Sequence, residues 1–159
     1  MANDKDDSLR KHILYLLRDG GAHLSFDDFI NRFPADLCDR RIDGLPYTPW
    51  QVLEHMRRAQ WDILEFSRDA NHVSPEFPKG YWPDPEQPGT AALWEQSVAE
   101  FRKDLEQMAA LVEDPATDVY ATIPHGDGQT ILREALLIAD HNAYHLGVLT
   151  MMARVLKVT

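Results

Sequence analysis

The histidines are the residues of this sequence with the clearest capacity for chemistry. Two of them, His141 and His145, form the run H-N-A-Y-H near the end of the chain. Residues four apart in an α-helix project from the same face, with about 6 Å of rise between them. Two imidazole nitrogens on one face can share a divalent cation, so this spacing makes a metal site the first hypothesis.

The face that the pair occupies strengthens this hypothesis. Five residues at helical spacing around the two histidines are apolar: Leu137, Ile138, Val148, Leu149 and Met152. Both rings are therefore expected to face the core, where a polar group needs partners. Backbone carbonyls or water could supply those partners, and this interpretation stays open beside a metal ion.

A third histidine is also expected to face the core. His55 lies between Val52 and Ala59 on the inward stripe of an upstream helix. If that helix runs antiparallel to the last one, His55 falls at the level of the pair. Three imidazoles at one level predict a mononuclear site with His55, His141 and His145 as ligands and open positions for water or substrate. Such donors suit a divalent transition metal, zinc or nickel first, with iron, manganese or copper as alternatives.

Two other kinds of metal site do not fit the sequence. The H-N-A-Y-H run lacks the glutamate that follows the first histidine of the H-E-x-x-H peptidase motif. Di-iron bundles need Glu-x-x-His pairs and further inward glutamates. The sequence contains no such pair, so a mononuclear site is the hypothesis that remains.

Other residues near the candidate site carry weaker signals. Asp62 shares the face of His55 and could accept from an imidazole or act as a general base, but a solvated or salt-bridged aspartate is the favoured interpretation. Tyr144 could line the pocket or pack, and no catalytic residue is assigned. His125 lies just before the last helix and is too far from the pair to be a fourth ligand. Nothing marks Cys38 as an activated thiol. The remaining histidines are expected on the surface or in loops: His12, His23 and His72.

The elements that must position these residues are helices. Apolar residues recur with a period of about 3.6 residues and predict an all-α chain. The expected helices span about residues 8–18, 25–33, 48–70, 90–112 and 130–156. The clearest start is at Thr48 as N-cap, followed by Pro49, with Gln51 reaching back to the cap.

The segment 71–89 between the two middle helices contains five of the ten prolines. A connection of this length can carry the chain back along the bundle, so that the two helices run parallel. Its aromatic residues Phe77, Tyr81 and Trp82 could form a lid. Anchoring of the loop to the core is the favoured interpretation.

The composition limits the classes of partner. The length of 159 residues and the hydrophobic content of 44% fit a single domain over residues 1–159. A net charge of −10 repels phosphate backbones and anionic lipid, so neither a nucleic acid nor a membrane is expected as a partner. The single cysteine excludes an internal disulfide framework, and no segment has the features of a signal peptide or a membrane span. We expect a cytoplasmic protein.

Two runs of sequence carry a similarity to a known family. These runs are W-Q-V-L-E-H-M-R-R-A-Q-W-D and L-R-E-A-L-L-I-A-D-H-N-A-Y-H-L-G. With the spacing between them, they resemble the DinB-like superfamily over nearly the whole chain. The resemblance implies an up-down-down-up four-helix bundle with a short extra helix after the first one. It also implies His55, His141 and His145 as the metal ligands, and a homodimer.

The same resemblance suggests a class of reaction. Some members of this family transfer low-molecular-weight thiols such as bacillithiol, or use mycothiol to isomerise maleylpyruvate. The implied function is a metal-dependent S-transferase or isomerase that acts on a small molecule. A metal-dependent hydrolase and a non-catalytic bundle that binds a metal or a small ligand are the alternatives.

Overall fold

The structure is a computed structural model that describes residues 2–158, and its regular elements are helices. Five α-helices follow one another along the chain: α1 (Ala2–Arg18), α2 (Phe26–Arg32), α3 (Pro49–Arg68), α4 (Ala91–Glu113) and α5 (Ile131–Val155). Two short 3₁₀ turns lie in the connections: η1 (Ala35–Leu37) and η2 (Lys79–Tyr81). Within the described residues, the strand-like pairing is limited to an isolated bridge between Thr122 and Thr130. The predicted all-α fold is therefore confirmed.

The helices begin at side chains that cap them. The Thr48 hydroxyl accepts from the Gln51 N–H at 3.3 Å, and the Gln51 side chain accepts from the Thr48 N–H at 3.0 Å. This reciprocal pair satisfies two amide donors that the start of a helix leaves free. It fixes where α3 begins, and with it the direction in which His55 points. Hydroxyl groups also cap α2, α4 and α5, from Ser25, Thr90 and Thr130.

Helix α1 begins at Ala2, well before the expected start near Ser8. The early residues are mostly charged or polar, so hydrophobic periodicity could not reveal them. Arg10 ties this part of α1 to the bundle, because it pairs with Asp6 at 2.8 Å and donates to the Val112 carbonyl of α4 at 2.6 Å. Asp6 of the additional turns is thus joined to α4 through Arg10.

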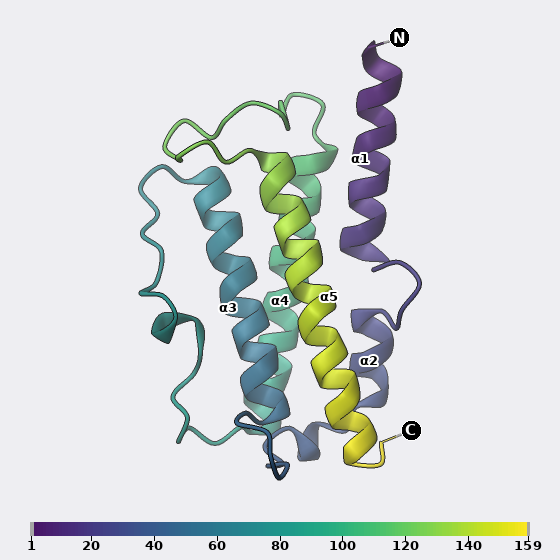
Figure 1. Ribbon diagram of the computed structural model, residues 1–159, viewed down its shortest axis with the longest axis vertical. Coiled ribbons are helices and arrows are strands. Elements are labelled where there is room, and N and C mark those ends of the chain that lie inside the picture. Colours follow the sequence, from purple (N-terminus) through teal and green to yellow (C-terminus); the bar gives the residue numbers. More distant parts are fainter. Residues whose placement is uncertain (1, 159) are drawn as a thin grey trace.

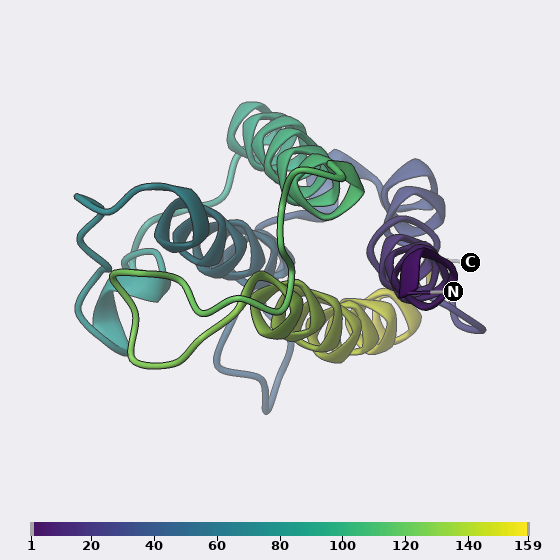
Figure 2. The same ribbon diagram turned by 90° about the horizontal axis from the view of Figure 1, so that it is seen from above.

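Helices α3 and α4 run in the same direction, and α1 and α5 run opposite to them (Figure 1). Trp50 near the start of α3 donates to Ser97 near the start of α4, and Arg68 at the end of α3 donates to Gln107 further along α4. The long connection allows this parallel pairing because it returns along the outer side of α3. Seen from above, α1 lies on the side of α4 and α5 away from α3 (Figure 2).

Two clusters of buried apolar side chains fill the bundle. One includes Leu53 of α3 and Leu149 of α5, and the other includes Leu64 of α3 and Ile138 of α5. The histidine pair of α5 lies between Ile138 and Leu149 in the sequence, and therefore between members of the two clusters. Across residues 2–158, no helix combines the length and the apolar character that spanning a bilayer requires.

The connection between α3 and α4 is anchored by only some of its aromatic residues. Tyr81 and Trp82 are half-buried against α3, whereas Phe77 is 84% exposed. The expectation that all three anchor the loop is therefore wrong for Phe77. The turn η2 directs Tyr81 toward α3, while Phe77 precedes that turn and meets Tyr81 only edge-on, with ring centroids 6.0 Å apart.

Candidate metal centre

The candidate ligands come from two antiparallel helices. His55 lies early in α3, and His141 and His145 lie on consecutive turns of α5. A hydrogen bond of 2.8 Å from Asn142 to Gln60 joins the same region of the two helices. The structure thus brings together all three histidines that the sequence analysis selected, over sequence separations of 86 and 90 residues.

The three rings direct the same atom to a common centre. His55 Nε2 lies 3.1 Å from His141 Nε2 and 3.2 Å from His145 Nε2. One ligand atom of each residue lies within 4.8 Å of the others. Nitrogen ligands bound to one divalent ion at about 2.0–2.1 Å are themselves roughly 3.0–3.4 Å apart. The geometry therefore fits a single cation held by imidazoles.

Hydrogen bonds alone would satisfy this cluster less well than a cation. His55 Nδ1 lies 3.0 Å from the Tyr81 carbonyl oxygen. Because a carbonyl only accepts, Nδ1 carries the proton. The neutral ring then has one lone pair at Nε2, which suits one donor, yet the nitrogens of His141 and His145 both approach it. A metal ion accommodates all three lone pairs at once.

Burial keeps these imidazoles in the uncharged form that can bind a metal. Desolvation, followed by the effect of neighbouring imidazoles, lowers the pKa of His141 and of His145 from 6.5 to about 4. Burial also lowers the pKa of His55, against the opposing effect of its hydrogen bond to Tyr81. At neutral pH all three rings can therefore offer a lone pair.

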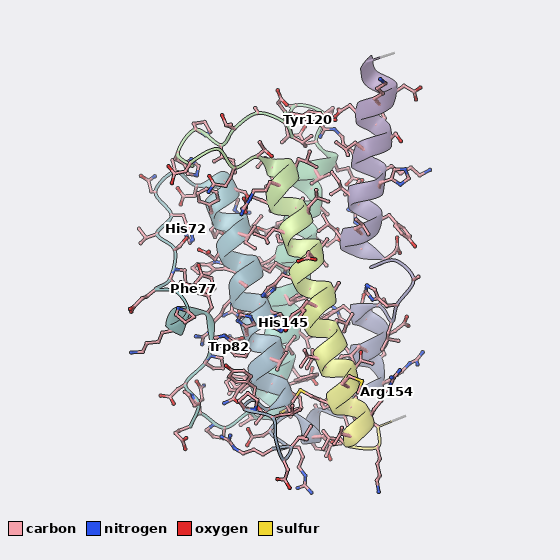
Figure 3. The ribbon with its side chains drawn as sticks, in the orientation of Figure 1. His72, Phe77, Trp82, Tyr120, His145 and Arg154 are labelled. Atoms are coloured by element: carbon pink, nitrogen blue, oxygen red, sulfur yellow. The ribbon has the colours of Figure 1, made fainter. Side chains whose placement is uncertain are left out.

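Aromatic rings surround the centre. The Trp82 indole stacks on His55 with ring centroids 3.9 Å apart, and Tyr47 stacks on the other side of Trp82 at 3.8 Å. Figure 3 shows Trp82 and His145 at similar heights of the bundle, one from the connection and the other from α5. Tyr144 meets His145 edge-on at 4.8 Å and is 69% exposed. This exposure does not fit a packing role in the core, and the ring lies beside a candidate ligand.

Asp62 is buried and pairs with residues of the connection. It is 8% exposed, and its carboxylate accepts from the Tyr81 hydroxyl at 2.6 Å and contacts His72 Nε2 at 2.7 Å. Of the two expected environments, the solvated one is therefore wrong, and the paired one is supported by the contact with His72. His72 does lie in a loop, but its side chain is only 8% exposed. The sequence could not reveal this pair because the path of the connection decides which side chain meets Asp62.

The other candidates lie outside the histidine cluster, as expected. His125 Nε2 contacts the Phe66 carbonyl at 2.7 Å, His23 contacts the carbonyl of the next residue, and His12 is exposed. Cys38 is 2% exposed, and burial raises the pKa of its thiol. This thiol is therefore not activated as a nucleophile.

Two contributions to the site have no signal in the sequence. The first is the Tyr81 carbonyl, because a backbone acceptor does not depend on residue type. The second is Arg58, which donates to the Trp82 carbonyl at 2.9 Å and pairs with the buried Glu54 at 2.8 Å. An arginine in a helix usually indicates a solvated face, and only the returning connection gives this one another role.

These features define an all-helical protein with a candidate three-imidazole metal centre between α3 and α5. The family model described as the DinB superfamily matches residues 24–149, a segment that contains all three histidines. The chain therefore belongs to the DinB superfamily, and the resemblance found in the sequence is confirmed. Comparisons with curated proteins and with solved structures give no match.

Proposed function

We propose that this chain is a metal-dependent enzyme that transfers a low-molecular-weight thiol to a small molecule, or uses such a thiol in an isomerisation. His55, His141 and His145 would hold a divalent transition metal, zinc or nickel in the first place. The observation that supports this most is the convergence of their Nε2 atoms, with separations of 3.1 and 3.2 Å from His55.

The donor set favours an anionic reactant. The cluster found among the described residues consists of three imidazoles and includes no carboxylate. Neutral ligands leave the charge of a divalent ion uncompensated, and three of them leave coordination positions free. A bound ion would lower the pKa of a thiol or a water molecule and so stabilise the anionic nucleophile.

The residues around the cluster bind and orient. The Tyr81 carbonyl holds the proton of His55 on Nδ1, which keeps Nε2 free for the metal. Trp82 covers one face of the His55 ring and excludes water from it. Tyr144 offers an exposed aromatic surface beside His145, where an organic substrate can pack.

The conjugation of a small thiol to 1-chloro-2,4-dinitrobenzene tests this proposal. A sulfur–carbon bond forms as chloride leaves, and the product is followed by its absorbance. With cysteine, glutathione or bacillithiol as the thiol, we expect a rate above the uncatalysed one for at least one of them. This rate should be lost with a chelator and in His145→Ala, and restored to the chelated protein by zinc or nickel.

The exposed His12 provides a matched control, because His12→Ala removes an imidazole of α1, a helix that contributes no residue to the cluster. This variant should keep the full rate. Equal rates with and without chelator would contradict the proposal.

Hydrolysis is the second candidate, because the open positions beside three neutral ligands could equally hold water. Metal-dependent cleavage of p-nitrophenyl acetate without added thiol would favour a hydrolase. Metal binding with neither reaction would favour a non-catalytic metal-binding bundle.

We also propose that the chain pairs as a homodimer through the last turns of α5, beyond Tyr144. Met151 and Val155 share one face of these turns and are 55% and 57% exposed. Gly147 lies one turn before Met151 with open space beside it, which permits close approach of a second helix. Sedimentation should show a dimer, and Met151→Glu should shift it to the monomer.

A further inference from the structure

Residues 79–82 form a short strap that crosses the outer side of α3 beside the candidate metal centre (Figure 3). Side chains of α3 hold the strap at successive positions. His55 Nδ1 donates to the Tyr81 carbonyl at 3.0 Å, and Arg58 donates to the Trp82 carbonyl at 2.9 Å. The strap is therefore the element that fixes the orientation of the His55 ring from outside.

Tyr81 is fixed at both of its ends. Its carbonyl oxygen accepts a hydrogen bond from His55 Nδ1, and its hydroxyl donates to Asp62 Oδ2 at 2.6 Å. Asp62 lies seven residues after His55 and therefore on the same face of α3. One helix face thus holds the backbone of Tyr81 at one point and its ring at another.

The Asp62 carboxylate is built into this position. It is 8% exposed, and its second oxygen contacts His72 Nε2 at 2.7 Å. A carboxylate that accepts two short hydrogen bonds in a buried place is a stronger and more directional anchor than a neutral acceptor. The surroundings of Asp62 therefore stabilise one position of the Tyr81 ring.

We propose that Asp62 is a positioning residue of the metal centre, which acts through Tyr81 to hold His55 with its proton on Nδ1 and its Nε2 toward the metal. The inference rests on the proposed metal site and deepens it. The hydrogen bond at one imidazole nitrogen decides which nitrogen is free to bind. When Asp62 releases the Tyr81 ring, the carbonyl moves with the strap and His55 loses its acceptor.

Two variants test this role. Tyr81→Phe removes only the hydroxyl, and Asp62→Asn keeps the shape but replaces one acceptor oxygen by an NH₂ group. Asp104→Asn is the matched control, because Asp104 is 6% exposed and lies on α4 rather than beside the strap. Circular dichroism verifies the helical content of each variant, and Tyr81→Phe, the smaller change, carries the test if Asp62→Asn unfolds.

The first measurement is the Kd for zinc by competition with a chromophoric chelator. We expect it to rise about tenfold in Asp62→Asn and Tyr81→Phe and to stay within a factor of two in Asp104→Asn. The second is the tautomer of His55 in the metal-free protein, read from long-range ¹⁵N–¹H correlations of the imidazole rings. Wild type and Asp104→Asn should have the proton on Nδ1, and the two test variants should show a mixture of tautomers.

These measurements separate the inference from the proposed function. If wild type binds no zinc but the tautomer of His55 changes in the two variants, the positioning role stands and the proposed metal site fails. If wild type binds zinc while both variants keep its Kd and its tautomer, the positioning role is overturned and the metal site stands. A shift of equal size in Asp104→Asn would also overturn it.

Discussion

The imidazole of His55 lies flat against the indole of Trp82, with ring centroids 3.9 Å apart and planes inclined by only 1°. One ring belongs to α3 and the other to the connection that follows it. Because Tyr47 stacks on the indole from the opposite side at 3.8 Å, Trp82 is held between two aromatic groups. The connection therefore shapes the surroundings of His55 without contributing a residue to the histidine cluster.

The Trp82 stack should support metal binding. Trp82→Ala removes the surface on which His55 rests and admits water to that face, so we expect the Kd for zinc to rise severalfold, by about threefold to tenfold. Trp82→Phe keeps an aromatic surface and should stay close to wild type. Competition titrations with a chelator measure both values, and equal Kd values for wild type and Trp82→Ala would contradict the supporting role.

The metal-free protein should lose stability as the pH falls. The pKa values of His141 and His145 are lowered to about 4 by burial in the folded state and return to about 6.5 on unfolding. Between these values the unfolded chain binds more protons, so the free energy of unfolding decreases as the pH drops from 6.5 toward 4. We expect the Tm to fall by about 5 °C between pH 7 and pH 5.

The same pH series in two variants tests whether the histidine cluster causes this decrease in stability. His141→Ala should show a smaller decrease than wild type, whereas His12→Ala should show the same decrease. An unchanged slope in His141→Ala would show that the cluster does not titrate in this way.

The thiol of Cys38 should take no part in the reaction. The side chain is 2% exposed, and burial raises the pKa of its thiol, so little thiolate is present at neutral pH. We expect iodoacetamide to label it slowly in the native protein and rapidly in guanidinium. Cys38→Ser should keep the rate of thiol conjugation. Loss of that rate in a folded variant would show that Cys38 takes part in the reaction.

Gln60 should hold α5 at the level of His55. Its side chain donates to the Phe101 carbonyl at 2.7 Å and accepts from Asn142 at 2.8 Å, so it joins three helices. Gln60→Leu leaves buried polar partners unsatisfied and should lower the free energy of unfolding by about 1–3 kcal/mol. Urea titrations measure this change. The exposed Gln96 gives the control, since Gln96→Leu should change the free energy of unfolding by less than about 0.5 kcal/mol.

The candidate ligands could be predicted because helical spacing encodes which side chains share a face. The H-N-A-Y-H run places two imidazoles on one side of a helix, and the Thr48–Gln51 capping pair fixes the start of the helix that carries His55. Both signals are local, so they survive without knowledge of the tertiary structure.

The surroundings of the ligands could not be predicted in this way. The Tyr81 carbonyl has no residue-type signature, and the stack of Trp82 on His55 depends on the path of a connection that lacks periodicity. The same path brings His72 to Asp62. These contacts arise from tertiary geometry, where sequence spacing carries little information.

The most direct test of the account is the metal content of the purified protein and of single histidine variants, measured by inductively coupled plasma mass spectrometry. We expect about one divalent transition metal per chain in wild type and in His12→Ala. That metal should be lost from folded His55→Ala, His141→Ala and His145→Ala. Wild-type stoichiometry in all three of these variants would contradict a shared centre.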